Sequence, residues 1–451
     1  MSRYQAYAEY KDSGVEWLGS VPTHWTVCRI KNVATINPSK SEARRLSPDS
    51  QVSFIPMEAI GDKGELDASR VKVLSEVLTG YTYVADGDLM IAKITPCFEN
   101  GKGTIAKNLV NGIGFATTEV IPIRPEKPTD ASFLFYVLNC NPFKFIAESS
   151  MYGAGGQKRV ADSFVAEYHL SFPTESERVK IANFLDHETT KIDLLIEKQQ
   201  ALIELLKEKR QAVISHAVTK GLSPNAPMKD SGVEWLGEVP AHWELTPLKY
   251  LCSFSGGGTP SKENLSYWTD GDIPWVSPKD MKSFWISDSQ DKITETAVKE
   301  SSTNFVEVGS LLMVVRSGIL QRTIPIAINT VKVTLNQDMK ALNFNSRIDV
   351  EYAANYILGN TDSLLLEWSK EGATVESIEQ EYLASSIFPV PPNEEQKQIN
   401  ASIKARMDIF NALEEKAKNG ISLLQERRTA LISAAVTGKI DVRDWQKPAQ
   451  A

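Results

Sequence analysis

The residue types that most often carry acid–base chemistry or bind metals are sparse in this chain. Its histidines and cysteines are His24, His169, His187, His216, His242, Cys28, Cys97, Cys140 and Cys252. His24 and His242 lie at equivalent places in a repeated segment, each directly before a tryptophan, but no serine, cysteine or carboxylate recurs near them at a useful spacing. We therefore expect hydrogen-bonded structural histidines. The cysteines form no C-x-x-C pair, which predicts buried free thiols and neither a zinc site nor a disulfide framework.

Motifs for nucleotide or methyl-donor chemistry are also incomplete. The glycine clusters GAGGQKR (Gly153–Arg159) and SGGGTPSK (Ser255–Lys262) lack the G-K-[ST] ending of a phosphate loop. An adenine methyltransferase would carry a D/N-P-P-F/Y signature, and Asn141-Pro142-Phe143 is one proline short of it. No G-x-G-x-x-G follows an expected strand to hold S-adenosylmethionine. The sequence predicts a chain with no catalytic residues, metal ligands or cofactor of its own, and so a non-enzymatic role.

Binding signals are better, and they centre on two segments that look like counterparts. In Gly87–Gly103 and in Gly309–Thr323, a glycine turn leads into an apolar strand that ends in a cation, Lys93 or Arg316. Arg, Lys, Gln and Asn in such loops are the side chains that read base edges and phosphates. The alternative for each residue is a solvated loop without a ligand. The candidate DNA-binding residues are Lys93, Thr95, Asn100, Lys102, Gln157, Lys158, Arg159, Thr259, Ser261, Lys262, Lys279, Arg316, Ser317, Gln321 and Arg322.

The elements that must position these loops are duplicated. Lys11–Trp25 reads KDSGVEWLGSVPTHW and Lys229–Trp243 reads KDSGVEWLGEVPAHW, an offset of 218 positions. The same offset separates LLKEKRQAVISHAVT (Leu205–Thr219) from LLQERRTALISAAVT (Leu423–Thr437). The chain is therefore a tandem duplication of one unit, made of a short collar, a globular body and a long helix.

The long helices are expected at residues 175–216 and 393–434, about 40 residues or roughly 60 Å each. Their apolar residues follow alternating three- and four-residue steps, as in the seam of a coiled coil. The expected seam residues are Ile181, Leu185, Ile192, Leu195, Leu202, Leu206, Val213, Ile403, Phe410, Leu413, Leu424 and Leu431. A single helix would expose its seam, so we expect the two to pair antiparallel about a pseudo-twofold axis, with the bodies at opposite ends. Each collar would then lie near the far end of the other half's helix. The alternative is that each helix packs only on its own body.

The bodies, residues 26–170 and 244–388, mix short apolar runs with turn residues, and residues 132–148 and 350–368 favour helices. The expected fold class is α/β, with a strand order that the pattern does not give. The expected boundaries are a collar and body over 1–171, a helix over 172–221, a second collar and body over 222–388, a second helix over 389–440, and a tail over 441–451. Unlike the collars and helices, the bodies have diverged. One frame with two unlike inserts predicts two recognition surfaces.

Length, composition and net charge restrict the number of domains and the class of protein. At 451 residues the chain is too long for one ordinary core. No run of about 18 apolar residues indicates a membrane span, and the N-terminus has no apolar signal region, so we expect a cytoplasmic protein. The net charge of −8 argues mildly against a protein that coats nucleic acid non-specifically, but it leaves sequence-specific binding open.

Several motifs together resemble the specificity subunit of a Type I restriction–modification system, over nearly the whole chain. They are the doubled collar, GGGTPSKENLSYW, GDLMIAKITPCFENGKG, the helix starts SFPTESERVKIANFLD and PVPPNEEQKQINASI, and the helix ends KRQAVISHAVTKGL and RRTALISAAVTGKIDV. The first helix start departs from the pattern, with Arg178 where the second has Gln396. We interpret that difference as drift at a helix cap.

The resemblance implies that each body is a target recognition domain for one half of a bipartite DNA site, separated by the paired helices. It implies two modification (methyltransferase) subunits as partners, which methylate adenine with S-adenosylmethionine. It also implies restriction subunits that use ATP and Mg²⁺. Two other hypotheses stay open: a chain that carries its own methyltransferase or nuclease activity, and a coiled-coil scaffold or DNA-binding adaptor outside restriction–modification. The recognised DNA sequence cannot be derived from these residues.

Overall fold

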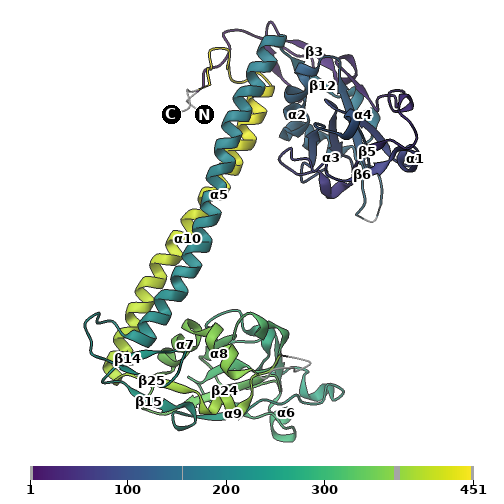
Figure 1. The fold of residues 1–451 in the computed structure, drawn as a ribbon. Helices are drawn as coiled ribbons and strands as arrows, with labels where there is room; N and C mark the ends of the chain where they lie inside the picture. Colours follow the sequence, from purple (N-terminus) through teal and green to yellow (C-terminus); the bar gives the residue numbers. More distant parts are fainter. Residues whose placement is uncertain (1–3, 155, 370–375, 448–451) are drawn as a thin grey trace. The chain divides into compact units, whose positions relative to one another are not determined.

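The computed structural model describes residues 4–154, 156–369 and 376–447, in two compact units. Unit 1 contains residues 1–199 and 419–451, and unit 2 contains residues 200–418. Each unit holds one collar, one globular body, the first part of one long helix and the last part of the other (Figure 1). Within the described ranges, no helix has the length and apolar character needed to cross a membrane. The end of the expected tail, residues 448–451, lies outside the described residues.

The body of unit 1 is built from three small sheets. The sheet orders are β6-β5-β10-β7, β4-β11-β8-β9 and β12-β3, and every pairing is antiparallel except that of β10 with β5. The strands of unit 1 are β1 Tyr10–Asp12, β2 Ser20–Pro22, β3 Thr26–Arg29, β4 Ala34–Ile36, β5 Gln51–Ile55, β6 Val71–Val73, β7 Thr82–Ala85, β8 Leu89–Ala92, β9 Gly103–Ile105, β10 Ile113–Ala116, β11 Val120–Pro125 and β12 His169–Phe172. Its helices are α1 Leu74–Val77, α2 Ala131–Asn139, α3 Asn141–Ser149 and α4 Asp162–Glu167.

The body of unit 2 repeats this topology although its sequence has diverged. Its sheet orders are β19-β17-β23-β20, β16-β24-β21-β22-β18 and β15-β25, so each strand has a counterpart in unit 1 except the added edge strand β18. The strands are β13 Met228–Asp230, β14 Glu238–Pro240, β15 Glu244–Pro247, β16 Cys252–Gly256, β17 Ile273–Val276, β18 Trp285–Ile286, β19 Asp291–Ile293, β20 Phe305–Val306, β21 Leu311–Val314, β22 Ile326–Asn329, β23 Val333–Leu335, β24 Met339–Phe344 and β25 Ile387–Val390. The helices are α6 Glu295–Glu300, α7 Val350–Gly359, α8 Thr361–Trp368 and α9 Gln380–Ser385.

The expected helix in each body is two helices, so that prediction was wrong in detail. In unit 1, Cys140 is extended (φ −73°, ψ 152°) between α2 and α3. Pro142 follows in the first turn of α3, and its missing N–H and fixed ring prevent the two segments from forming one helix. In unit 2, Asn360 breaks the run and donates a hydrogen bond from its side chain to Tyr356 O at 2.8 Å, closing the end of α7.

The long helices begin where expected and run slightly further. They are α5 Glu175–Lys220, of 46 residues, and α10 Asn393–Val436, of 44 residues. In unit 1, Arg428 of α10 donates to Asp193 of α5 at 2.9 Å, and in unit 2, Arg210 of α5 donates to Asn411 of α10 at 2.7 Å. These two contacts are the same pair of positions shifted by 218, and both require antiparallel helices in one register. Figure 1 shows α5 and α10 side by side.

The seam of this coiled coil is shifted by one residue from the expected one in its middle part. Leu195 and Leu202 are 47% and 41% exposed, whereas Ile196 and Ile203 are 7% and 9% exposed. The next seam position after Ile192 lies three or four residues further on, at Leu195 or Ile196. Both are apolar, so the spacing alone does not decide which of the two faces the partner helix. In α10, Leu413 is likewise exposed, at 42%.

The collars are β-hairpins, β1–β2 and β13–β14, with the same register. After each hairpin a fully buried tryptophan donates from its indole N–H to a glutamate at the start of a long helix. Trp25 bonds Glu177 and Trp243 bonds Glu395, both at 3.1 Å and both 152 residues apart in sequence. Sequence reasoning missed these two glutamates, although their equal separation from the tryptophans was visible.

The collar histidines complete the same contacts. His24 Nε2 lies 3.1 Å from Glu177 Oε2, and His242 Nε2 lies 2.7 Å from Glu395 Oε2. The expectation of hydrogen-bonded histidines is confirmed. The far helix end meets each collar as well, because Gly438, at the end of α10, packs against the collar of unit 1, and Gly221, at the end of α5, packs against that of unit 2. Both glycines have φ near +75° (73° and 75°), so a side chain would be strained there.

The replacement of Gln396 by Arg178 is not simple drift. Arg178 is 5% exposed, and its Nε donates at 2.7 Å to Asp130, which is 3% exposed at the start of α2. Gln396 is fully buried and accepts a hydrogen bond from the backbone N–H of Asp349, at the start of α7, at 2.7 Å. Both side chains therefore fasten a long helix to its body, one through an ion pair and one through neutral hydrogen bonds.

Two of the four cysteines depart from the expectation of complete burial. Cys140 and Cys252 are buried, but Cys28 and Cys97 are partly exposed, and all four are free thiols. Burial raises the pKa of Cys140 and of Cys252 to about 12.

Candidate nucleic-acid interface

In unit 1, two loops far apart in sequence are joined into one surface. The first follows β8 and contains Lys93 and Thr95, and the second follows α3. The Thr95 hydroxyl donates to the Gly156 carbonyl at 2.6 Å and accepts from the Lys158 N–H at 3.0 Å, while Ile94 and Arg159 pair in an isolated antiparallel bridge. The structure thus brings together the candidates Lys93, Thr95, Gln157, Lys158 and Arg159.

The charged side chains of this surface are partly neutralised. Arg159 donates from Nε and Nη2 to the two carboxylate oxygens of Glu119, both at 2.9 Å. These hydrogen bonds lower the pKa of Glu119 and raise that of Arg159. Lys93 Nζ lies 3.9 Å from Asp162, and Lys102 Nζ donates to the Met57 carbonyl at 3.1 Å. Asn100 is exposed in the same loop.

In unit 2, the corresponding surface is built at the end of β21. Arg316 donates from Nε to Asp338 at 2.7 Å and pairs with Ser377 in an isolated antiparallel bridge. The Thr259 hydroxyl donates to the side chain of Gln337, which places the GGGTP loop beside the same turn. Ser317 Oγ accepts from the Ile319 N–H at 3.4 Å and caps a short 3-10 helix.

The remaining candidates of unit 2 are less tightly grouped. Gln321 and Arg322 are exposed at the end of that 3-10 helix, and Ser261 and Lys262 are exposed in the GGGTPSK loop. Lys279 follows β17 and forms an ion pair with Asp291 at 2.6 Å, whose hydrogen bond raises the pKa of Lys279. Lys279 and Asp291 therefore belong with the β19-β17-β23-β20 sheet, whereas Arg316 follows β21 of the other sheet.

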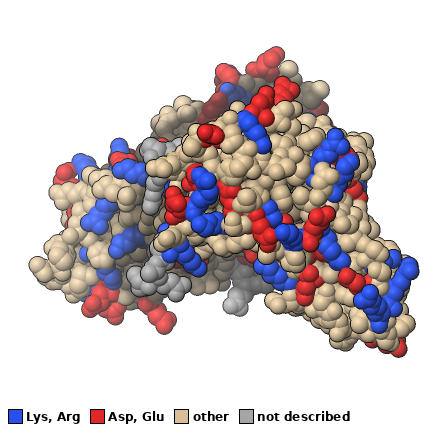
Figure 2. Space-filling model, turned by 90° about the horizontal axis from the view of Figure 1, so that it is seen from above, with Lys and Arg blue, Asp and Glu red and all other residues tan. Residues whose placement is uncertain are grey.

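Acidic and basic side chains are intermixed on the face of the molecule that Figure 2 shows. Positive charge there comes as separate side chains among carboxylates, in agreement with the net charge of −8. On the described residues of that face, no broad positive surface marks a path for a phosphate backbone.

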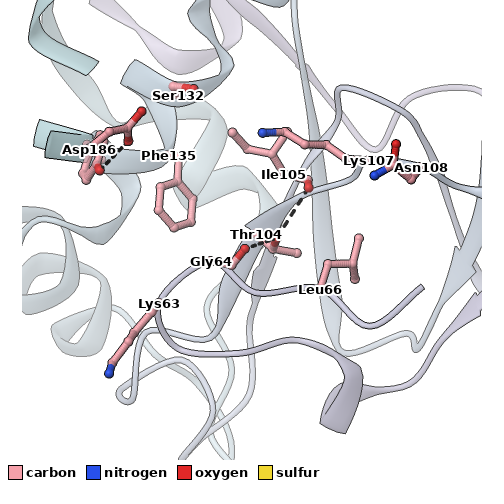
Figure 3. A pocket seen from close by; sticks show the side chains of 11 residues that line it. Lys63, Gly64, Leu66, Thr104, Ile105, Lys107, Asn108, Ser132, Phe135 and Asp186 are labelled. Carbon is pink, nitrogen blue, oxygen red and sulfur yellow. Dashed lines mark hydrogen bonds between the residues drawn. The ribbon is translucent and has the colours of Figure 1, made fainter. Parts of the chain in front are cut away.

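A cavity of about 340 Å³ in unit 1 is a feature that sequence reasoning did not anticipate (Figure 3). Thr104, at its wall, donates to the Gly64 carbonyl at 2.7 Å, and Tyr136 donates to Asp186 of α5 at 2.6 Å. Lys63 and Lys107 line the cavity and are exposed. It therefore adds two cations close to the β9 strand that no motif had indicated.

Among the described residues, no cluster of three or more His, Cys, Asp or Glu side chains has the geometry to hold a metal ion. The interface consists instead of hydrogen-bond donors on short loops, supported by two sheets in each body. Such an arrangement can bind a polar ligand by shape and hydrogen bonding.

Comparison with known proteins identifies the architecture. Residues 22–205 and 240–423 each match the model of the Type I restriction modification DNA specificity domain, and the two matches begin 218 positions apart. Together they cover most of the chain, so this protein belongs to that family.

Relatives of known description agree. The chain is 38% identical over 201 residues to the specificity subunit of the Type I restriction enzyme EcoR124I/EcoR124II of Escherichia coli, covering 44% of this chain and 47% of that protein. It therefore spans about half the length of that relative, and 27% of the EcoEI specificity subunit, at 39% identity. The putative type I restriction enzyme MjaX specificity subunit of Methanocaldococcus jannaschii is 23% identical over 447 residues, covering 94% of this chain and 96% of that one.

Two solved structures share the fold. One belongs to a study of complex assembly and conformational transition in the type I R-M system, with a TM-score of 0.75, 16% identity and coverage of 93% and 99%. The other is the HsdS subunit from Thermoanaerobacter tengcongensis, with a TM-score of 0.60, 16% identity and coverage of 93% and 98%. The expected fold is confirmed: an α/β tandem duplication with two long antiparallel helices.

Proposed function

We propose that this chain is the non-catalytic DNA-specificity subunit of a Type I restriction–modification complex. Each body reads one half of a bipartite, asymmetric DNA site, and the paired helices set the spacer between the halves. The observation that supports this most is the repetition of one topology with different side chains at corresponding loops, Lys93 and Arg159 in one body and Arg316 in the other. A repeated frame suits duplex DNA, because the two strands of the duplex are themselves related by twofold axes.

The proposed partners are two modification subunits, which methylate adenine with S-adenosylmethionine, and restriction subunits, which use ATP and Mg²⁺. This chain would need no cofactor. Exposed leucines on the long helices, Leu195 and Leu202 in α5 and Leu413 in α10, supply apolar docking positions for partner helices. The complex would work in the cytoplasm, where DNA is accessible.

Sequencing of methylated DNA tests the proposal. The chain is expressed with its modification subunit in cells that lack other adenine methylation, and methylated positions are mapped. A bipartite, asymmetric motif that depends on both proteins is the expected result. The purified chain alone, given S-adenosylmethionine and DNA, should incorporate no methyl group. Methylation by the chain alone, or the absence of any motif that depends on it, would contradict the proposal.

A scaffold without DNA contact is the second candidate, and it is favoured by the pairing of Arg159, Arg316 and Lys279 with carboxylates. If it were correct, replacing Lys93 and Arg316 together with glutamine would leave site-specific DNA binding by the assembled complex unchanged. The specificity proposal predicts that this variant loses binding or changes its motif.

A further inference from the structure

An acidic residue in the same structural position fixes an arginine in each body, although the two arginines come from different segments. Glu119 directly precedes β11, and Asp338 directly precedes β24, its counterpart. The backbone carbonyl of each accepts an N–H from the end of the neighbouring strand, Lys93 N at 2.9 Å or Val315 N at 2.8 Å. The two acids are therefore structural equivalents.

The arginines lie on opposite sides of one bridge. In unit 1 the bridge pairs Ile94 with Arg159, and in unit 2 it pairs Arg316 with Ser377. Unit 1 thus supplies its arginine from the glycine-rich loop, where unit 2 has a serine. Unit 2 supplies its arginine from the strand end, where unit 1 has an isoleucine. Among the described residues, both bodies therefore contain an arginine–carboxylate pair at the same place, with the arginine supplied by a different segment in each.

The pairs leave the same part of the guanidinium group available. In both, the Nε and Nη2 edge faces the carboxylate: Arg159 at 2.9 Å to Glu119, and Arg316 at 2.7 Å to Asp338. Among the described residues, the end formed by Nη1 and the second Nη2 hydrogen meets one protein acceptor, the Gln157 carbonyl, to which Nη1 of Arg159 donates at 3.3 Å. The side chains of Arg159 and Arg316 are 32% and 53% exposed. Two parallel donors at a fixed angle match the O6 and N7 acceptors that guanine presents in the major groove.

Electrostatics favours a base over a phosphate as the ligand. An arginine paired with a carboxylate has no net charge, so its attraction for a phosphate is weak and the carboxylate repels that phosphate. A base edge is neutral, so its binding depends more on the orientation of the hydrogen-bond donors than on their charge. Lys158, Lys262 and Arg322 are exposed and form no ion pair with any described residue, which leaves them to bind the backbone.

We propose that Arg159 and Arg316 each read one guanine, one in each half-site, with Glu119 and Asp338 as positioning residues that orient the guanidinium groups. This inference rests on the proposed function, because it assigns the residues that carry specificity within it. Lysine keeps the charge of arginine but loses the two parallel donors, so an Arg-to-Lys change separates base reading from charge.

The test uses the complex of the full chain with its modification subunit. Methylated motifs are mapped for the wild type, Arg159→Lys and Arg316→Lys, with Arg70→Lys as the matched control. Arg70 lies in the first body and forms an exposed ion pair with Glu58 at 2.8 Å. We expect Arg159→Lys to lower the preference for guanine over the other bases, at one position of one half-site, by roughly 5- to 150-fold. Arg316→Lys should lower the preference for guanine at one position of the other half-site, and the control should keep the wild-type motif.

Glu119→Gln provides a second variant, which keeps Arg159 but removes its anchor. It should lower the preference for guanine at the same position as Arg159→Lys does, with an unchanged thermal midpoint. If the arginine variant does not assemble, this variant shows whether the Arg159 side chain reads that guanine. An unchanged motif, or weaker binding to all sequences alike, would overturn the proposal in favour of a structural or phosphate-binding role. So would a wild-type motif without guanine in a half-site. A wild-type complex without any motif would instead contradict the proposed function itself.

Discussion

Replacing Asp130 with alanine tests how the first body is fastened to helix α5. Asp130 and Arg178 are 3% and 5% exposed, and their ion pair spans 2.7 Å. The guanidinium group also lies 3.9 Å from the centre of the Phe172 ring, so little water reaches it. Removal of one partner leaves a buried charge without a counter-ion, at a cost of about 3–5 kcal/mol. In a unit of roughly 230 residues, each kcal/mol shifts the melting temperature by about 2–4 °C, so the expected loss is roughly 6–20 °C.

The other half of the chain supplies the compensating change. At the position of Arg178 it has Gln396, which donates to backbone carbonyls of Arg347 and Pro391 at 3.0 and 2.8 Å. We therefore expect Asp130→Ala combined with Arg178→Gln to be more stable than Asp130→Ala alone, because no buried charge remains. Differential scanning calorimetry of the full chain measures both.

The control for this cycle is Glu58→Ala, which breaks the exposed pair with Arg70. Their side chains are 64% and 50% exposed, so the loss should be below about 1 kcal/mol. If Asp130→Ala melted no lower than this control, the buried ion pair would not fasten the body to α5. A double variant that lost as much stability as the sum of Asp130→Ala and Arg178→Gln would contradict the coupling between the two residues.

Further predictions concern pH, thiol reactivity and spacing. A hydrogen bond from Tyr83 at 2.6 Å lowers the pKa of Glu42 in the folded chain. The pair should therefore stabilise the fold fully above the pKa of an unfolded glutamate, about 4.3, and lose this contribution as the pH falls through the lower pKa of the folded state. Thermal melts between pH 3 and 7 should show a shallower acid-side loss for Glu42→Gln, and equal slopes would contradict this. Cys140 and Cys252 should react with a disulfide reagent at pH 8 only after unfolding, since burial raises the pKa of both to about 12, and reaction in the native chain would disprove it. Removing one heptad from each of α5 and α10 should shorten the spacer of the methylated motif, and a constant spacer would show that the helices do not set it.

Much of the frame could be predicted because it repeats. One offset of 218 located the collars and the two helix starts, which the structure places at Glu175 and Asn393. The same offset relates Asp193 to Asn411, and their two contacts fix the antiparallel register. A duplicated pattern is informative because each copy tests the other. It fails where two neighbouring residues are equally apolar, as at Leu195 and Ile196, and it also fails at Leu413, which is 42% exposed.

The interface could be predicted only in part, because its contacts join segments that are distant in sequence. The strand-end loops were identified, and the structure joins the loop of Thr95 to that of Lys158. No local pattern indicates that Glu119 would pair with Arg159, 40 residues away, or that Lys279 would pair with Asp291 of β19. These contacts follow from the sheet order of the bodies, which divergent short strands do not reveal.

Exchange of one body tests whether each body reads its own half of the DNA site. Residues 26–170 are replaced by the corresponding body of another family member with a different specificity, and methylated DNA is sequenced after expression with the modification subunit. If each body reads one half-site, one half of the motif should change while the other half and the spacer stay the same. A change in both halves, or in neither, would show that the bodies do not read separate half-sites.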